Sequence, residues 1–228
     1  GKKVLKAAAN LLTPVTLELG GKSPAIVLEG ADIEVSARRI IWGKGLNAGQ
    51  TCIAPDHLLA EEKLCLSLIK YMKKAIHDFY GKRPLESNHL AKIINRHHFE
   101  RLKKLLEQAN EKKQIICGGE IDEKENRISP TLIQIETRED PLMSEEIFGP
   151  IIPILKFKDL QTTLNEIRAE PKPLALYIFG GSLEEQQAII NGTSSGSVCI
   201  NDVVMQAGIP NLPFGGVGAS GMGRYHGY

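Results

Sequence analysis

Short apolar runs alternate with longer amphipathic segments along most of the chain, and this alternation constrains the fold more than any other sequence feature. We expect strands at the following residues: 15–19, 24–28, 57–61, 114–117, 131–135, 151–157, 174–179 and 197–200. We expect helices, with apolar residues at helical spacing, at the following: 2–12, 33–46, 62–79, 89–110, 159–168 and 182–191. Strands that alternate with helices pair mostly in parallel. The sequence therefore predicts an α/β fold, a mostly parallel twisted sheet covered by helices.

The charge pattern narrows the class of partner. The chain has 28 Lys and Arg against 27 Asp and Glu, a net charge of +1, whereas nucleic-acid binding needs a concentrated basic surface. The densest basic stretch, residues 103–113, is interleaved with Glu107 and Glu111, which indicates a solvated helix face. No run of about 18 apolar residues occurs, as a membrane-spanning helix requires. We expect neither nucleic acid nor a membrane as a partner of this chain.

The four cysteines and six histidines show no metal-ligand pattern. No two cysteines form a CxxC pair, and the adjacent His97 and His98 would point about 100° apart on a helix. We therefore expect no metal site and no disulfide framework, and a reducing, cytoplasmic location is the simplest interpretation.

Glu18 ends an apolar run immediately before Gly20 and Gly21. A carboxylate at a sharp backbone turn can face a cleft, where it could act as a base. This segment alone leaves open the alternative that Glu18 is an edge-of-strand carboxylate in contact with water.

Cys52 follows Gly49 on a predicted turn between a helix and a strand. A nucleophilic thiol needs both accessibility and a fixed direction, which such a turn provides. Most free cysteines are instead small buried hydrophobes, the role that we assign to Cys65, Cys117 and Cys199 inside regular elements. For Cys52 the turn alone leaves both interpretations open.

The Glu18 and Cys52 segments together resemble, in order, the glutamate and cysteine signatures of the aldehyde dehydrogenase superfamily. Their separation of 34 positions is usual in that family. Further matching blocks run to the end of the chain: Glu145–Pro150, Pro213–Gly216 and Ser220–Arg224. The phrasing of three segments is similar to the class 3 branch, which acts on fatty or aromatic aldehydes: Asn47–Asp56, Lys172–Tyr177 and Gly223–Gly227.

The resemblance implies an oxidoreductase that converts an aldehyde to a carboxylic acid with NAD or NADP. Cys52 would form a thiohemiacetal and then a thioester, with its own backbone N–H as one oxyanion donor, and Glu18 would activate the hydrolytic water. Glu146 would contact the nicotinamide ribose, Phe148 the nicotinamide ring, and Gly20 would belong to the same cofactor site. For Phe148 a loop anchor in the core remains an alternative. The parent protein is expected to be a homodimer acting on a small-molecule aldehyde.

Three further features of the sequence bear on this resemblance. Asn201 could support the active site by a hydrogen bond or could cap a turn at a strand end. Residues 216–221 fit GxGxxG, but no clear strand precedes them, so we reject a dinucleotide fingerprint there. Gly45 stands where the family's cysteine pattern usually carries an aromatic or aliphatic residue.

The resemblance also predicts how the chain is organised. Residues 1–13 would be the last helix of a coenzyme-binding domain, residues 14–205 the catalytic domain, and residues 206–228 a Gly-rich C-terminal segment. The family's upstream oxyanion asparagine and cofactor-binding lysine have no counterpart here, so we expect this chain by itself not to oxidise aldehydes. One rival hypothesis is a non-catalytic binding or assembly domain of the same fold. Another is acylating dehydrogenation with coenzyme A, which Glu18 disfavours because acylating relatives typically lack that base.

Overall fold

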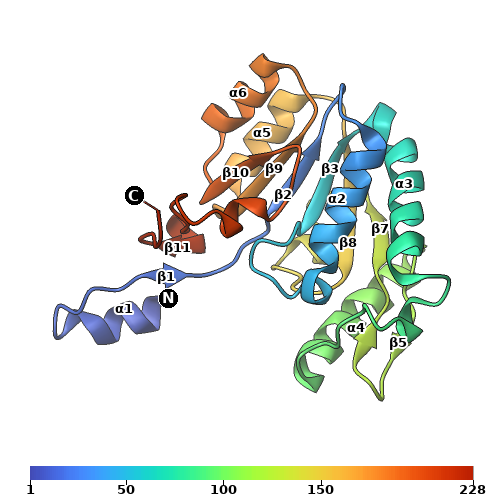
Figure 1. The fold of residues 1–228 in the computed structure, drawn as a ribbon, viewed down its shortest axis with the longest axis horizontal. Helices are drawn as coiled ribbons and strands as arrows, with labels where there is room; N and C mark the ends of the chain where they lie inside the picture. Colours follow the sequence, from blue (N-terminus) through green and yellow to red (C-terminus); the bar gives the residue numbers. More distant parts are fainter. Residues whose placement is uncertain (228) are drawn as a thin grey trace.

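A seven-stranded sheet forms the centre of the computed structural model, which describes residues 1–227 (Figure 1). The strand order is β10-β9-β2-β3-β8-β7-β4, and every neighbouring pair is parallel except β4 and β7. The predicted α/β fold with a mostly parallel sheet is confirmed. The strands of this sheet are β2 (Pro24–Val27), β3 (His57–Glu61), β4 (Ile115–Cys117), β7 (Thr131–Ile135), β8 (Ile151–Phe157), β9 (Ala175–Phe179) and β10 (Ser197–Ile200).

Helices cover both faces of the sheet. Because β3, β8 and β7 lie on one side of β2 while β9 and β10 lie on the other, right-handed crossovers place α2 and α3 on one face and α5 and α6 on the opposite face (Figure 1). The α-helices are α1 (Lys2–Ala9), α2 (Ile33–Gly45), α3 (Glu62–Tyr80), α4 (Arg96–Glu111), α5 (Leu160–Ala169) and α6 (Leu183–Gly192). The 3-10 turns are η1 (Leu46–Gly49), η2 (Pro84–Glu86), η3 (Pro141–Met143), η4 (Met205–Gly208) and η5 (Gly218–Ser220).

Polar caps set where the crossover helices begin. Asp32 accepts a hydrogen bond from the backbone N–H of Val35 at the start of α2. Asp159 caps α5 in the same way, and Ser182 forms a reciprocal capping box with Glu185 at the start of α6. Each cap satisfies backbone donors that would otherwise lack partners, so these helices begin within a residue or two of the predicted positions.

The core lies between the sheet and its two helix layers. All five residues of β9 and all four of β2 are buried, because strands covered on both faces consist of continuous apolar runs rather than alternating ones. The largest fully buried side chains include Tyr177 and Phe179 of β9 and Phe99 of α4.

Helix α4 begins at Arg96 rather than at residue 89, so the predicted start is wrong. Asn95 accepts a hydrogen bond from the backbone of His98 and caps the helix there. Leu90 and Ile93 are nevertheless buried, but they reach the core from an irregular segment. The backbone N–H of Ile94 donates to the Gln50 side chain instead of continuing a helix.

Two short strand pairs lie outside the main sheet. β1 (Leu17–Glu18) pairs antiparallel with β11 (Gly221–Met222), so the Gly-rich C-terminal segment contains a short strand. The pairing places Glu18 opposite Gly221. β5 (Ile121–Asp122) and β6 (Arg127–Ile128) form a hairpin that the sequence pattern did not indicate.

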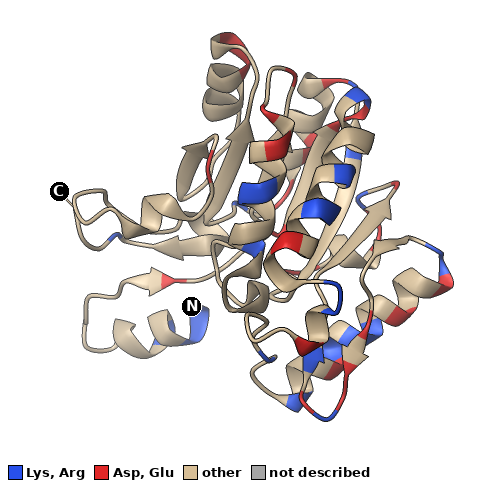
Figure 2. Cartoon of the chain, turned by 45° about the vertical axis from the view of Figure 1, so that its right-hand side comes forward, with Lys and Arg blue, Asp and Glu red and all other residues tan. Residues whose placement is uncertain are grey.

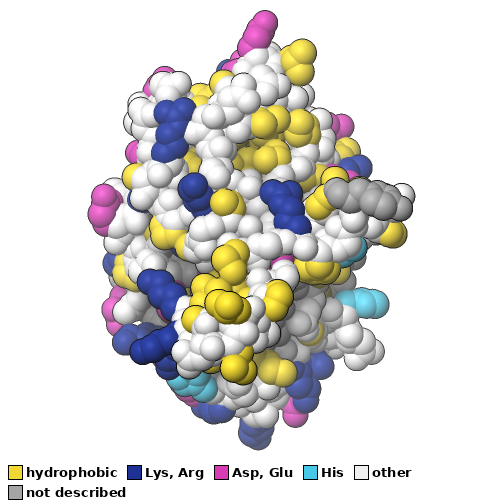
Figure 3. Space-filling view, turned by 90° about the vertical axis from the view of Figure 1, so that its left-hand side faces the viewer, with side chains coloured by type: hydrophobic (Ala, Val, Ile, Leu, Met, Phe, Trp, Pro, Cys, Tyr) yellow, Lys and Arg dark blue, Asp and Glu magenta, His cyan; other side chains and the backbone are white. Residues whose placement is uncertain are grey.

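The surface carries mixed charges, with one apolar region. Figure 2 shows Lys and Arg interleaved with Asp and Glu along α4, and ion pairs such as Arg96–Glu100 and Lys103–Glu123 join them. Figure 3 shows hydrophobic side chains gathered on the side of the molecule that carries α1 and the C-terminal segment. Exposed apolar residues of α1, of the residues just after it and of the C-terminal segment are Val4, Leu11, Leu12, Met205, Ile209, Leu212, Met222 and Tyr225. Within residues 1–227, no helix combines the length and apolarity that crossing a membrane would require.

Candidate active site

The segments that the sequence singles out gather at the amino-terminal edge of the parallel sheet. Glu18 precedes β2, Cys52 precedes β3 and Glu146 precedes β8. These three strands are neighbours or next neighbours and run in the same direction, so the segments before them lie at one edge. Their charges interact, since the carboxylates of Glu146 and Glu18 both raise the pKa of the Cys52 thiol.

The turn before Cys52 has a backbone conformation that few residues adopt. Asn47, Ala48 and Gly49 have φ values of 50°, 53° and 75°, all in the left-handed region. A side chain at Gly49 would overlap the backbone carbonyl of Gly149, so glycine is required there for space as well as for conformation. Strained backbone of this kind persists only where the surrounding structure holds it, and it is frequent at functional sites.

Gln50 holds this turn from a buried position. Its Nε2 donates to the carbonyls of Asn47 and Lys92, both at 2.9 Å, and its Oε1 accepts from the backbone N–H of Ile94 at 2.8 Å. The amide therefore ties the cysteine turn to the irregular segment before α4. The turn is rigid because it is fixed from two sides.

The Cys52 sulfur is half-buried beside two backbone donors. Burial raises the pKa of the thiol, the carboxylates of Glu146 and Glu18 raise it further, and hydrogen bonds from the N–H groups of Cys52 and Ile53 oppose the shift. The resting residue is therefore a thiol, and its proton must be removed before it can act as a nucleophile. The same two N–H groups are in position to serve an oxyanion formed next to the sulfur.

The other three cysteines lie where the sequence placed them, inside regular elements. Cys65 is buried in α3, and Cys117 and Cys199 are partly buried in β4 and β10. Among the four, Cys52 is the one carried by a turn.

Glu18 is a carboxylate without a hydrogen-bond partner. Both of its carboxyl oxygens are buried and unpaired, and burial raises its pKa, which the nearby His226 opposes. Because both oxygens are shielded from solvent, the alternative that Glu18 is a strand-edge carboxylate in contact with water is wrong. A raised carboxyl pKa is the property that a general base working near neutral pH needs.

The C-terminal segment brings two side chains to this site that the sequence reasoning did not assign. Burial, together with the charges of Glu18 and Cys52, raises the pKa of Tyr225. Tyr225 pairs through its backbone with Phe214, and the rings of Phe214, Tyr225 and His226 contact one another. The one sequence signal was that Tyr225 and His226 lie within the class 3-like phrase Gly223–Gly227.

Glu146 rests on the two glycines that follow Glu18. A Cβ at Gly20 would overlap the Glu146 carboxylate, and the backbone N–H of Gly21 donates to it. Burial raises the pKa of Glu146 to about 7, with Asp56 adding to the shift and Lys44 and Lys22 opposing it. Gly20 is therefore a cradle for Glu146, and a half-buried carboxylate held this way suits the vicinal hydroxyls of a ribose.

Phe148 is not a core anchor. Its side chain is 36% exposed, and its backbone has a φ of 50°, unusual for a bulky residue. This exposure removes the alternative role and leaves the ring free to contact a bound group.

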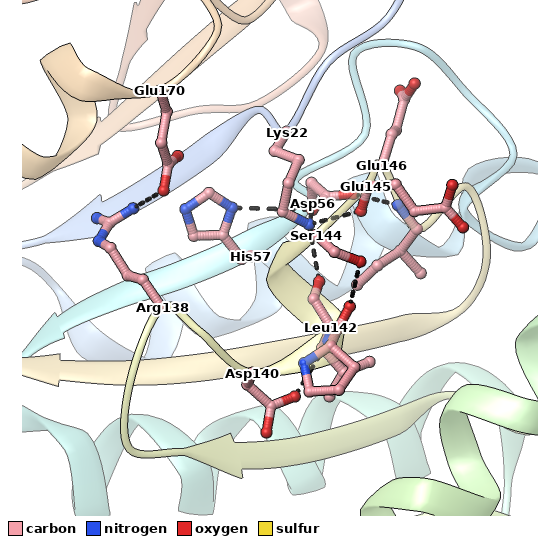
Figure 4. Close-up of polar contacts among 12 residues, drawn as sticks. Lys22, Asp56, His57, Arg138, Asp140, Leu142, Ser144, Glu145, Glu146 and Glu170 are labelled. Atoms are coloured by element: carbon pink, nitrogen blue, oxygen red, sulfur yellow. Dashed lines mark hydrogen bonds and ion pairs between the residues drawn. The ribbon is translucent and has the colours of Figure 1, made fainter.

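Lys22, Asp56 and His57 form a buried polar cluster beside the segment that carries Glu145 and Glu146 (Figure 4). Lys22 Nζ donates to Asp56 Oδ2 at 2.5 Å and to the carbonyls of Leu142 and Glu145, both at 2.9 Å. Burial alone would raise the pKa of Asp56, but the Lys22 ammonium holds it well below its usual range. Burial lowers the pKa of Lys44 to about 8 and also lowers that of His57.

Two residues left open by the sequence have structural roles. Asn201 Oδ1 accepts from the backbone N–H of Gly180 at 3.0 Å, so Asn201, which follows β10, caps the turn at the end of β9. A side chain at Gly45 would overlap the Tyr80 hydroxyl, which explains the absence of a larger residue there. Within residues 1–227 no group of three or more His, Cys, Asp or Glu could hold a metal ion.

Comparison with known proteins gives consistent results. The model of the Aldehyde dehydrogenase family matches residues 1–228. Aldehyde dehydrogenase family 3 member A2 of Rattus norvegicus is 48% identical over 227 residues, covering 100% of this chain and 46% of that protein. Aldehyde dehydrogenase, dimeric NADP-preferring, of the same organism is 45% identical, covering 100% and 49%. The solved structure of a Staphylococcus aureus AldH in a substrate-bound state superposes with a TM-score of 0.96 at 48% identity, covering 100% of this chain and 49% of that one.

The chain spans about half the length of the curated relatives it matches. The match extends over the whole chain, and it includes both the class 3-like sequence phrasing and the fold. This chain belongs to the aldehyde dehydrogenase family.

Proposed function

We propose that the full-length protein containing this chain oxidises an aldehyde to a carboxylic acid with NAD or NADP, using Cys52 as nucleophile and Glu18 as general base. The observation that carries the proposal is the placement of Cys52 just after the left-handed turn at residues 47–49, where two carboxylates of raised pKa, Glu18 and Glu146, act on its thiol. Perturbed titratable groups of this kind cluster at active sites. Membership in the family supports the same reaction.

The first step belongs to Cys52. Its sulfur, after losing the proton, attacks the aldehyde carbon, so a C–S bond forms and the carbonyl electron pair moves to oxygen. The N–H groups of Cys52 and Ile53, which already face the sulfur, would donate to the resulting oxyanion of the thiohemiacetal.

Residues on the cofactor side fit a nicotinamide dinucleotide. Glu146 would accept hydrogen bonds from the ribose hydroxyls, with Gly20 providing the space for its carboxylate, and the exposed ring of Phe148 would contact the nicotinamide. When bound, the cofactor supplies the acceptor for the hydride that leaves the thiohemiacetal carbon. Either NAD or NADP is compatible with these residues, and one relative is named as NADP-preferring.

Glu18 serves the second half of the reaction. Its carboxylate would take a proton from a water molecule as the water oxygen attacks the thioester carbon; the C–S bond then breaks, releasing the carboxylic acid and regenerating the Cys52 thiol. An unpaired buried carboxylate costs folding free energy, so its presence argues for a role in chemistry over the rival of a non-catalytic binding or assembly domain.

Assembly and location are part of the proposal. We expect a cytoplasmic homodimer of the full-length protein, in line with the relative named as dimeric. The apolar side of this chain, which carries α1 and the C-terminal segment, is suited to being covered by the rest of the protein or by a second subunit (Figure 3). The division into residues 1–13, 14–205 and 206–228 remains a prediction.

The test is a product assay of the full-length enzyme with fatty and aromatic aldehydes and each cofactor. We expect one carboxylic acid formed for each cofactor reduced, with and without added coenzyme A. Formation of acyl-coenzyme A in place of the acid would support the acylating rival, and no turnover with either cofactor would support the non-catalytic one. The 228-residue chain alone, assayed in parallel, is expected to be inactive.

A further inference from the structure

We propose that Lys22 and Asp56 are positioning residues that form a buried ionic latch between the cysteine turn and the segment carrying Glu146. The role of the latch in catalysis rests on the proposed function, whereas the latch itself is defined by hydrogen bonds. Three segments distant in sequence meet at this pair: the residues after Gly21, the residues after Cys52, and residues 142–147.

The Lys22 ammonium has its three donors matched by three acceptors. Besides Asp56 Oδ2 at 2.5 Å, these are the carbonyls of Leu142 and Glu145, each at 2.9 Å. An ammonium group has three N–H donors, so this set satisfies it fully. The side chain is 13% exposed, and it therefore has little access to water as an alternative partner.

The Asp56 carboxylate completes the latch. While Oδ2 accepts from Lys22, Oδ1 accepts from the backbone N–H of Ile147 at 2.8 Å. The backbone N–H of Asp56 donates to the carbonyl of Ser23 at 2.8 Å, which ties it to the residue after Lys22. The Asp56 side chain is 3% exposed and carries a second positive neighbour in Lys44.

The contacts on the third segment identify what the latch holds. Lys22 donates a hydrogen bond to the carbonyl of Glu145, and Asp56 accepts one from the N–H of Ile147. The backbone of Glu146 is therefore held on both sides (Figure 4). The Glu146 carboxylate in turn rests on Gly20, close before Lys22. The position of Glu146 relative to Cys52 is thus set through the side chains of Lys22 and Asp56.

The latch has a consequence separable from stability. Loosening it should let Glu146 move relative to Cys52, which raises the KM for the cofactor, and displacements of about 1 Å can change rates by as much as 100-fold. A merely structural ion pair would change stability without changing the relation between these two sites.

The experiment compares four variants in the full-length enzyme: Lys22→Met, Asp56→Asn, the double variant, and Arg138→Met as a matched control. Arg138 has the same 13% side-chain exposure, but its ion-pair partners are Glu166 and Glu170, at 2.9 and 2.6 Å, rather than residues 142–147. Three quantities are measured for each variant: the rate of hydrogen exchange in the peptide 142–148, the KM for NAD or NADP, and the denaturation midpoint. Asp56→Asn preserves shape, so it keeps the test available if Lys22→Met does not fold.

The double variant is decisive because it removes the uncompensated charge that each single change leaves behind. We expect it to recover most of the denaturation midpoint, while exchange of residues 142–148 and the cofactor KM stay on the order of tenfold above wild type. Recovery of exchange and KM together with stability would overturn the proposal, as would equal changes in Arg138→Met. Failure of the proposed function would instead appear as absent turnover in the wild-type enzyme, where exchange of 142–148 still decides whether the latch exists.

Discussion

The two edges of the central sheet hold the same kind of ion pair in different surroundings. At the amino-terminal edge Lys22 and Asp56 lie 2.5 Å apart, with side-chain exposures of 13% and 3%. At the carboxyl-terminal edge Lys63 and Glu29 also lie 2.5 Å apart, with exposures of 54% and 73%. Distance alone therefore does not distinguish the pairs, and burial does.

The difference follows from the dielectric surroundings. Opposite charges in water gain little from contact, because solvent screens them and the side chains lose freedom, whereas a buried charge cannot lose its partner without a large penalty. In many open α/β sheets the ligand site lies at the carboxyl ends of the strands. Here the perturbed carboxylates and the thiol lie at the amino ends, and the carboxyl ends carry ordinary solvated pairs such as Lys158–Glu62.

The largest effect should come from the amino-edge nucleophile. In the full-length enzyme, Cys52→Ala should reduce aldehyde oxidation by roughly 10⁴-fold or more, since no other group can form the thioester. Cys199→Ala, a change at a thiol of similar partial burial in β10, is the matched control and should leave kcat near wild type. Substantial turnover in Cys52→Ala would place the nucleophile elsewhere.

The next largest effect is expected from the ion pairs at the two edges of the sheet. Lys22→Met should lower the free energy of unfolding by about 3–5 kcal/mol, because it leaves the buried Asp56 charge uncompensated. Lys63→Met should leave the urea denaturation midpoint within scatter of wild type, since its partner is already solvated. Equal shifts in the two variants would show that burial does not separate the edges.

Stability as a function of pH should sharpen the comparison further. Glu146 has a folded-state pKa of about 7 against an ordinary 4.5, so the folded protein retains a proton that the unfolded chain has released between these values. Stability therefore falls as pH rises through that window, and the loss is complete above about pH 7. Solvent screening of this half-exposed group reduces the loss to about 1 kcal/mol.

Glu146→Gln removes this ionisation and tests the sign. The variant should be more stable than wild type at about pH 8.5, and the difference should vanish as the pH approaches 4.5. Glu29→Gln at the carboxyl edge is the control, and because its ion pair with Lys63 is solvated, it should leave the denaturation midpoint within scatter of wild type at about pH 8.5. A Glu146→Gln variant that gains stability at low pH and loses it at high pH would contradict the burial of this carboxyl.

The sequence predicted the main sheet well because its strands are covered on both faces. The apolar runs at β3, β7 and β8 coincide with the observed strands, since burial on both sides leaves little choice of residue type. Helix α4 was placed seven residues too early because Leu90 and Ile93 have helical spacing but fill the core from a loop. Pattern alone cannot distinguish the two cases.

The sequence predicted the site residues that lie in recognisable motifs, but not the residues whose role depends on tertiary contacts. Glu18, Cys52, Gly20 and Glu146 lie in motifs, and their segments meet because parallel strands begin at one edge. Lys22 and Asp56 were inside the same motifs but gave no signal of their own, since their partners at residues 142–147 are set by tertiary packing. The approach of Tyr225 and His226 depends on the β1–β11 pairing, which two-residue strands do not reveal in a sequence.

The central claim is that the amino-terminal edge carries a cysteine nucleophile served by a separate carboxylate base. The most direct test mixes the full-length Glu18→Gln enzyme with an aldehyde and NAD or NADP, stops the reaction with acid, and measures the protein mass. The account predicts one acyl group on the Cys52 peptide, a burst of one reduced cofactor per active site, and a steady-state rate lower by about 10²–10⁴-fold. A near-normal steady-state rate with no acyl group on Cys52 would contradict it.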